Sequence, residues 1–222
     1  LYEQNQELIN KIEKEFKVEK ELMLALMGIE TNFGNYVGKM DILSSLATLS
    51  FDKRRSEFFT NELITLLKLI ETKKVDHKSL YGSWAGAFGF FQFMPSTIRN
   101  YALDYNNDKR IDLKDNEDAY PSAANYLKRV GWSNKITWGR KVFIGNYNGK
   151  TDEKKYNLLS YWASKGILKA NKDKLPNVKV KARLIIPDGY KKYGYLAYKN
   201  FDSLLNWNRS NYFAIAVGTL AL

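Results

Sequence analysis

Glu30 is a single carboxylate placed at the end of an apolar segment. Seven of the eight residues from Leu22 to Ile29 are apolar, and Glu30 is followed by the turn-like stretch Thr-Asn-Phe-Gly. Burial and the partial negative charge at a helix C-terminus both favour the protonated form of such a side chain. A carboxyl group of this kind can serve as a general acid near neutral pH. A surface glutamate that turns to water or pairs with a lysine is the alternative, and the position alone does not separate the two interpretations.

Oxygen-bearing side chains recur between residues 104 and 118 at a spacing that suits a hard cation such as Ca²⁺. The candidate ligands are Asp104, Asn106 and Asp108 at positions one, three and five of an EF-hand-like loop, the backbone carbonyl of Arg110 at position seven, and Asp118. Two residues depart from the usual pattern, because Lys109 replaces the glycine at position six and Asp115 replaces the glutamate at position twelve. A solvated acidic loop with helix caps is the alternative.

The stretch YGSWAGAFGFFQF, residues 81–93, combines glycines and aromatic residues with two polar side chains, Ser83 and Gln92. Glycine permits a close approach of the backbone. Polar groups on an aromatic wall suit the recognition of sugars and their N-acetyl groups. For most of these rings, packing in a core is the alternative.

Composition narrows the class of protein. The chain has 222 residues, enough for a sizeable core in one large domain or two lobes. Its net charge of +11 favours an anionic partner such as nucleic acid, an anionic membrane or an acidic cell-wall polymer, although a solvated basic surface is the plainer interpretation. No aromatic-basic nucleic-acid motif stands out. The absence of cysteine excludes disulfides, and the single His77 disfavours a histidine-based triad or a multi-histidine metal site.

Hydrophobic periodicity predicts a mainly α protein of the α+β class. No apolar run approaches the roughly 20 residues of a membrane span. The chain starts at Leu1 and shows no signal-peptide pattern, so we expect a mature or trimmed chain. Near residue 176 the pattern changes to that of a small antiparallel sheet, with strands expected within 178–187 and 193–198. Helices are predicted over residues 1–17, 18–28, 42–50, 55–71, 96–101, 121–130, 152–165 and 210–222.

Three stretches together resemble the membrane-bound lytic transglycosylase B family of peptidoglycan enzymes. They are GIETNFGNYVGKMDILSSLATLSFDKRRSEFF, YGSWAGAFGFFQFMPSTIRNYALDYNNDKRIDLKDNEDAYPSAANYLKRVGW and NWNRSNYFAIAVGTLA. The match is dense from Val18 to Trp132 and sparser afterwards. The resemblance implies one catalytic domain over 1–222. It would comprise a helical lobe and lysozyme-like core over about 1–170, a β-element over about 176–200 and a closing helix over about 209–222.

The resemblance also assigns roles to residues. Glu30 matches the family's single catalytic acid, and the loop from Asp104 to Asp118 matches its structural Ca²⁺ site, with no organic cofactor. Trp207 stands where the family usually has a tyrosine, and Phe213 replaces another, so neither offers a hydroxyl group. The residues that match substrate-binding positions are Ser83, Gln92, Tyr126, Arg54, Arg55, Trp207 and Asn208.

The reaction implied by the resemblance is cleavage of the β-1,4 bond from N-acetylmuramic acid to N-acetylglucosamine, with formation of a 1,6-anhydro product. An ordinary glycosidase needs two carboxylates, whereas here the substrate's own N-acetyl group would assist one. The alternatives are a hydrolytic muramidase and a non-catalytic peptidoglycan-binding scaffold; nucleic-acid binding is disfavoured. The expected partners are peptidoglycan glycan strands and other cell-wall enzymes. The expected location is the periplasm or cell envelope, with a lipid anchor on a full-length precursor left open.

Overall fold

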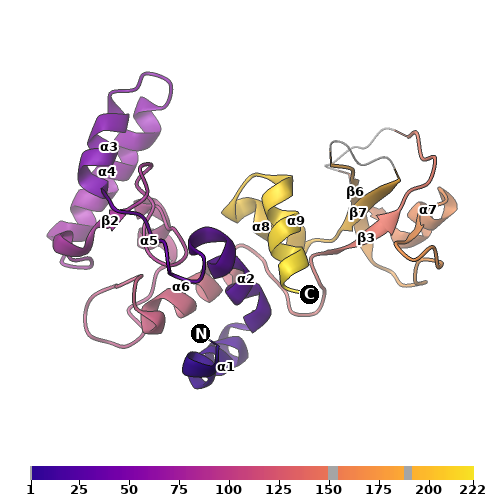
Figure 1. The fold of residues 1–222 in the computed structure, drawn as a ribbon, viewed down its shortest axis with the longest axis horizontal. Coiled ribbons are helices and arrows are strands. Elements are labelled where there is room, and N and C mark those ends of the chain that lie inside the picture. The colour runs from indigo at the N-terminus through magenta and orange to yellow at the C-terminus, as the bar shows by residue number, and fades with distance from the viewer. Residues whose placement is uncertain (1, 150–154, 188–191) are drawn as a thin grey trace. The chain divides into compact units, whose positions relative to one another are not determined.

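The computed structural model describes residues 2–149, 155–187 and 192–222 (Figure 1). The chain forms two compact units, one that runs to Arg129 and one that starts at Val130, and Ala221 groups with the first. Within the described ranges, no helix combines the length and the apolar character that crossing a membrane would require.

The first unit is helical. Its helices are η1 (Glu3–Asn5), α1 (Gln6–Phe16), α2 (Lys20–Thr31), α3 (Ile42–Ser50), α4 (Ser56–Glu71), η2 (His77–Ser79), α5 (Pro95–Tyr101) and α6 (Asn116–Arg129). These helices confirm the ones predicted for this part of the chain, although some begin or end at different residues. Helix α2 continues to Thr31, so Glu30 lies inside its last turn. Helix α6 begins before the predicted start at Pro121, because the Asp115 carboxylate accepts the Glu117 N–H at 3.0 Å and so caps the helix.

The core of the first unit is built around α2. Leu22, Met23, Leu26 and Met27 of this helix are buried, as the nearly all-round apolar pattern predicts. The Tyr120 hydroxyl of α6 donates to the Met27 sulfur at 3.1 Å, which joins the two helices inside the core. Helices α3 and α4 form an antiparallel hairpin beside this core (Figure 1).

A two-stranded sheet brings together the segment that follows α2 and the glycine-aromatic stretch. Strand β1 (Met40–Asp41) pairs with β2 (Tyr81–Gly82), with Met40 opposite Gly82. Just before β1 the backbone runs so close to β2 that a Cβ atom on Gly38, whose φ is +87°, would lie 2.1 Å from the carbonyl oxygen of Gly82. The sequence does not predict this sheet, because strands of two residues are too short to show an alternating pattern.

The second unit contains a five-stranded antiparallel sheet in the order β4-β6-β7-β3-β5. Its strands are β3 (Gly139–Phe143), β4 (Asn157–Leu158), β5 (Leu168–Lys169), β6 (Lys181–Ile185) and β7 (Tyr193–Ala197), and its helices are α7 (Leu159–Ser164), α8 (Asn200–Trp207) and α9 (Asn211–Leu220). The predicted late antiparallel sheet is confirmed in β6 and β7. The sheet is wider than expected, since β3 enters it well before the predicted change of pattern at residue 176.

Two helical predictions need correction in the second unit. The predicted helix over 152–165 is shorter, because residues 157–158 form strand β4 and α7 begins at Leu159; residues 152–154 lie outside the described residues. Helix α8 was not predicted, since its eight residues fall between a strand and a stronger apolar pattern. The closing helix is confirmed as α9.

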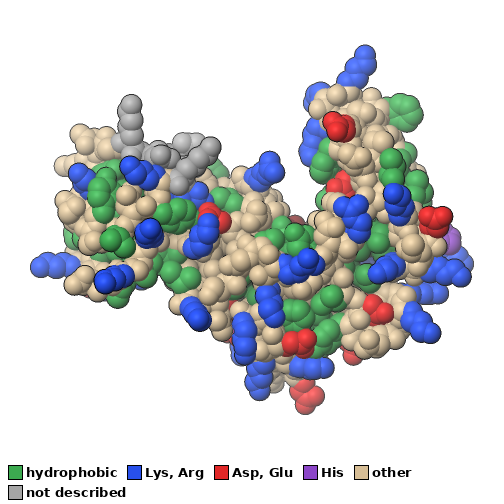
Figure 2. Space-filling model, turned by 180° about the vertical axis from the view of Figure 1, so that it is seen from behind, with side chains coloured by type: hydrophobic (Ala, Val, Ile, Leu, Met, Phe, Trp, Pro, Cys, Tyr) green, Lys and Arg blue, Asp and Glu red, His purple; other side chains and the backbone are tan. Residues whose placement is uncertain are grey.

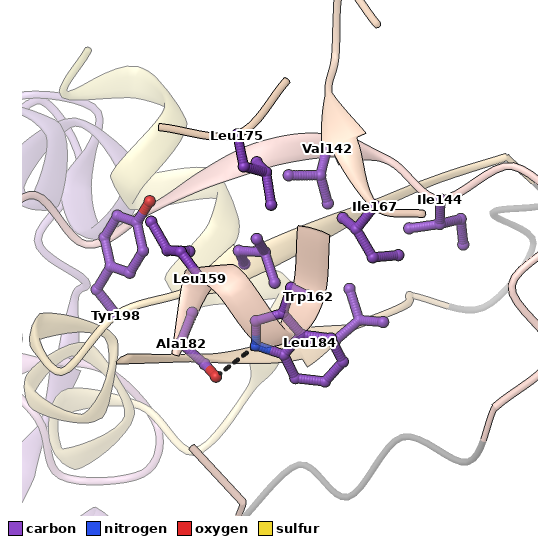
Figure 3. Close-up of a cluster of buried hydrophobic side chains, with 10 residues drawn as sticks. Val142, Ile144, Leu159, Trp162, Ile167, Leu175, Ala182, Leu184 and Tyr198 are labelled. Carbon is purple, nitrogen blue, oxygen red and sulfur yellow. Dashed lines mark hydrogen bonds between the residues drawn. The ribbon is translucent and has the colours of Figure 1, made fainter. Parts of the chain in front are cut away.

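A compact apolar cluster holds the sheet of the second unit to α7 (Figure 3). Val142, Ile167 and Leu184 are almost fully buried in it. The Trp162 indole N–H donates to the carbonyl oxygen of Ala182 at 2.8 Å, so the polar group of this large side chain is satisfied inside the cluster.

Candidate active site

Helix α2 delivers Glu30 to the surface of the first unit. The side chain lies in the last helical turn and is half-buried. The helix ends immediately afterwards, because Asn32 adopts a left-handed conformation with φ of 49° and donates its N–H to the carbonyl oxygen of Gly28 at 3.0 Å. The predicted acid therefore lies where a well-packed helix ends.

Thr31, which the sequence analysis did not single out, fastens this end of α2. Its side chain is buried, and its hydroxyl lies 2.8 Å from the carbonyl oxygen of Phe90, within hydrogen-bond distance. The Thr31 hydroxyl oxygen also accepts the N–H of Gly34 at 3.0 Å, and the Thr31 carbonyl oxygen accepts the N–H of Tyr36 at 2.9 Å. The residue next to Glu30 thus ties α2 both to the glycine-aromatic stretch and to its own following turn. The one signal in the sequence is a hydroxyl residue directly after the acid.

Ser83 closes a tight loop within the glycine-aromatic stretch. Its N–H donates to the carbonyl oxygen of Ala87 at 2.8 Å, and its Oγ accepts the N–H of Ala87 at 3.0 Å. Trp84, at the tip of this loop, is 68% exposed. Because Oγ acts as an acceptor inside the loop, the hydroxyl proton is still available to a ligand.

Gln92 has an internal role that the sequence analysis did not predict. Its Nε2 donates to the carbonyl oxygens of Gly89, at 2.9 Å, and of Val37, at 3.2 Å. The second bond joins the glycine-aromatic stretch to the segment that follows Glu30. Both amide protons are used in this way, so a ligand would meet only the acceptor Oε1.

Tyr126 of α6 lies in an aromatic group of the first unit. Its ring contacts Tyr101 edge-on at a centroid distance of 4.6 Å and lies 6.0 Å from the ring of Phe93. Burial raises the pKa of the Tyr126 hydroxyl to about 12, so it remains protonated at neutral pH.

Arg54 and Arg55 lie in the turn between α3 and α4, and both are exposed. Arg54 forms an ion pair with Asp52, with 2.6 Å between Nη2 and Oδ2, and its hydrogen bonds lower the pKa of Asp52 to about 2. The Arg55 guanidinium lies over the ring of Phe58 at 4.4 Å. The charge of Arg54 is therefore offset by the Asp52 carboxylate, whereas Arg55 lies against an aromatic ring and keeps more of its charge.

Trp207 and Asn208 belong to the second unit. Trp207 is the last residue of α8, and Asn208 caps that helix by donating its N–H to the carbonyl oxygen of Leu204 at 3.0 Å. The Asn208 side-chain oxygen accepts the N–H of Ser210 at 3.1 Å. These contacts fix the corner between α8 and α9 and occupy one acceptor of the Asn208 side chain.

The predicted Ca²⁺ loop of the first unit is held by hydrogen bonds from its own backbone. Asp104 Oδ2 accepts the N–H of Lys109 at 2.9 Å, Asn106 Oδ1 accepts that of Asp108 at 3.0 Å, and Asp108 Oδ1 accepts that of Arg110 at 2.8 Å. Lys109 adopts a φ of 73°, the left-handed conformation that glycine usually provides. The substitution of lysine at position six therefore leaves the turn intact.

Asp118, one of the two candidates for closing this loop, is hydrogen-bonded to the loop backbone. Its carboxylate is buried and accepts the N–H groups of Tyr105, at 2.8 Å, and Asp112, at 2.9 Å. Burial is the main cause that raises the pKa of Asp118, with a smaller contribution from the charge of Asp104. Asp115, the other candidate, is occupied as the cap of α6.

One carboxylate oxygen of the loop, Asp104 Oδ1, is in a position that favours a nearby cation. Asp104 Oδ1 is buried and accepts no hydrogen bond, which is costly for a carboxylate oxygen unless a positive group lies nearby. In the described part of the chain, no three Asp, Glu, His or Cys side chains are arranged to hold a metal ion. A cation at Asp104 would therefore also depend on the amide and backbone oxygens of the loop.

The comparisons define the class of protein. The chain belongs to the Transglycosylase SLT domain family, which it matches over residues 1–222. Mostly helical, with a small antiparallel sheet, it has the lysozyme-like fold of lytic transglycosylases, as the resemblance implied.

Three relatives make the similarity specific. The chain is 36% identical over 230 residues to the membrane-bound lytic murein transglycosylase B of Escherichia coli K12, covering 99% of this chain and 60% of the relative. The structure of Pseudomonas aeruginosa SltB3 in complex with NAG-anhNAM-pentapeptide superposes with a TM-score of 0.92 and 32% identity, over 99% of this chain and 60% of that chain. The E. coli lytic transglycosylase Slt35 in complex with calcium gives a TM-score of 0.87 and 33% identity, over 99% of this chain and 70% of that one. This chain thus spans about three fifths of the first two relatives.

Proposed function

We propose that this chain is a peptidoglycan lytic transglycosylase in which Glu30 is the single acid and base. The observation that carries the proposal is the fixed position of Glu30 at the end of α2, where Thr31 binds the glycine-aromatic stretch that contains Ser83 and Gln92. Membership of the transglycosylase family supports it. The SltB3 structures, which contain NAG-anhNAM-pentapeptide and NAG-NAM-pentapeptide, support the class of substrate.

In the proposed reaction, protonated Glu30 donates its proton to the glycosidic oxygen as the bond from C1 of N-acetylmuramic acid breaks. The resulting carboxylate then takes the proton of the C6 hydroxyl of the same sugar. That hydroxyl oxygen attacks C1 and forms the 1,6-anhydro bond, so no water is consumed and Glu30 is protonated again. The two proton transfers use one carboxylate in its two forms.

The proposed contacts of the glycine-aromatic stretch follow from the groups that its internal hydrogen bonds leave available. The Ser83 hydroxyl proton and the Gln92 Oε1 are a donor and an acceptor for the N-acetyl group. Tyr126, which matches a substrate-binding position of the family, is proposed as a further contact. We also propose four further substrate-binding residues: Arg54 and Arg55 of the first unit, and Trp207 and Asn208 of the second. Of these, Arg55 is the strongest candidate for a substrate carboxylate, since Arg54 already pairs with Asp52.

The test is the mass of the released fragments. Purified peptidoglycan digested with the wild-type chain should release 1,6-anhydro muropeptides, each lighter by one water than the hydrolysis product. Glu30→Gln should retain the fold and glycan binding but lose at least about 10²-fold in rate. Glu21→Gln, an exposed glutamate on the same helix, is the matched control and should keep wild-type rates. Reducing-end products would identify a hydrolytic muramidase, and binding without turnover a scaffold.

We further propose that the loop from Asp104 to Asp118 binds Ca²⁺ in a structural role. The ligands would be Asp104, Asn106, Asp108, the Arg110 carbonyl and Asp118. The buried, unsatisfied Asp104 Oδ1 supports this, as does the calcium complex of Slt35. The ion would hold loop oxygens together and would take no part in the chemistry at Glu30.

The proposed location is the cell envelope, because peptidoglycan lies there and the E. coli relative is described as membrane-bound. The glycan strand is the proposed partner. Contacts with other cell-wall enzymes remain a prediction.

A further inference from the structure

The first unit contains a pocket between the C-terminal half of α4, helix α5 and the loop that contains Ile111. Its volume is about 240 Å³. Leu69, Ile98 and Ile111 line it and are 5%, 1% and 9% exposed, so its floor is apolar. None of the residues that line it is a proposed catalytic residue or Ca²⁺ ligand, and Ile111 lies in the proposed Ca²⁺ loop, directly after Arg110.

Three cations surround this apolar floor. Lys68, Lys74 and Arg99 line the pocket and are exposed, and no aspartate or glutamate is among its lining residues. Among the described residues, none of these three cations lies within 4 Å of a carboxylate oxygen. Like charges gathered around a low-dielectric floor raise the local potential for an anion.

The walls of the pocket are held in place before any ligand arrives. The buried carboxylate of Glu62 on α4 accepts the N–H of Ser96 at 2.8 Å and its hydroxyl at 2.6 Å, which fixes the start of α5. On the other side, the Ile111 N–H donates to the carbonyl oxygen of Lys74 at 2.8 Å. A preformed pocket binds with a smaller loss of conformational entropy than one that must assemble.

We infer that this pocket binds a small amphipathic carboxylate, with the apolar body on Leu69, Ile98 and Ile111 and the carboxylate among Lys68, Lys74 and Arg99. The volume is below the usual range for drug-sized ligands, about 300–1,000 Å³, and corresponds to about eight groups of the size of water. It therefore suits a single unbranched chain of about eight carbons, free in solution.

Octanoate is the probe, titrated into the whole chain below its micelle concentration and followed by calorimetry and by amide chemical shifts. We expect binding with shifts centred on Leu69, Ile98 and Ile111. Affinity should rise about fourfold for each CH₂ added from butanoate to octanoate, the gain expected for burying a methylene group. Octanol, which has the same chain without the charge, should bind at least tenfold more weakly.

Arg99→Gln tests the cationic side of the pocket and should weaken octanoate binding about tenfold or more, because it removes a contact to a charged group. Lys14→Gln, an exposed lysine on α1, is the matched control for net charge and should leave the affinity unchanged. Equal affinities in Arg99→Gln and wild type, equal binding of octanol and octanoate, or no binding at millimolar octanoate would each overturn the inference. Binding to vesicles with anionic lipid but not to octanoate would assign this face to a membrane surface and also overturn it.

Discussion

Thr31 shows how the position of the proposed catalytic acid, Glu30, depends on the residue beside it. A helix terminus frays easily, because its last carbonyl groups lack partners within the helix. Here the N–H of Tyr36 supplies a partner for the terminal carbonyl of Thr31, and the Thr31 hydroxyl separately joins α2 to the Phe90 carbonyl. Glu30 is therefore held by a side chain that makes no proposed contact with substrate, so Thr31 is a positioning residue.

Thr31→Val tests this role, because valine keeps the shape and removes the hydroxyl. The part-buried Phe90 carbonyl and Gly34 N–H would lose their bonds to this hydroxyl, at a cost of about 1 kcal/mol. A small displacement of Glu30 should lower kcat by roughly 10–10²-fold with little change in KM. Thr31→Ser should restore most of kcat. The measurement is kcat and KM well below the melting temperature of each variant; wild-type kcat in Thr31→Val would show that Glu30 does not need this anchor.

At the same scale, the sequence offered candidate residues but not the contacts that the structure gives them. The apolar helix before Glu30 drew attention to this acid, and the resemblance to the family assigned its role, which remains a prediction. The internal bonds of Gln92 to Val37 and Gly89, and those of Thr31 to Phe90, join residues far apart in the chain or depend on a turn. Only the folded backbone brings such partners together, so spacing in the sequence cannot reveal them.

At the scale of elements, an aspartate near the end of the loop from Asp104 to Asp118 can either cap helix α6 or close the proposed Ca²⁺ site. Spacing alone offered Asp115 and Asp118 as the closing ligand. Because Asp115 caps α6 and Asp118 faces into the loop, the helix start selects between them. Helical periodicity predicted α6 but not its true beginning, since the cap lies in a stretch without apolar residues at helical spacing.

Calcium should raise the melting temperature of the wild-type chain, because an ion that binds only the folded loop shifts the unfolding equilibrium. At tenfold excess over Kd the gain is about 1.4 kcal/mol, and we expect a Kd of about 10⁻⁴–10⁻³ M, given the positive Lys109 and Arg110 in the loop. Asp118→Asn should abolish the shift, whereas Asp115→Asn, which can still cap α6, should retain it. Calorimetric melting with and without Ca²⁺ distinguishes these outcomes; a shift lost in Asp115→Asn but kept in Asp118→Asn would exchange the two assignments.

On the scale of the whole molecule, the sequence predicted the mainly helical class and the late antiparallel sheet. The division at Arg129 and the early strand β3 escaped prediction. Strand β3 pairs with β7, more than fifty residues later, and short strands in such distant pairs have no local signal that identifies their partner. The apolar cluster around Trp162 likewise assembles from segments separated in sequence (Figure 3).

The net charge of +11 is also a property of the whole molecule. Lys and Arg side chains are distributed over the face shown in Figure 2 rather than gathered in one patch. Such a field attracts an acidic polymer from a distance, but it cannot specify which bond is cleaved. Its contribution should therefore be to association and not to the chemical step.

Raising the salt concentration should separate these two contributions. The Debye length falls from about 30 Å at 0.01 M to about 10 Å at 0.1 M ionic strength, which screens exposed charges from a distant polymer. Initial rates on purified peptidoglycan should show KM rising several-fold over this range, with kcat nearly constant, because the chemistry proposed for Glu30 takes place within contact distance. An uncharged chito-oligosaccharide, offered as a substrate in place of peptidoglycan, is the control and should show a KM independent of salt. A fall in kcat with constant KM would mean that the charge acts on the catalytic step, and the long-range role of the basic surface would be wrong.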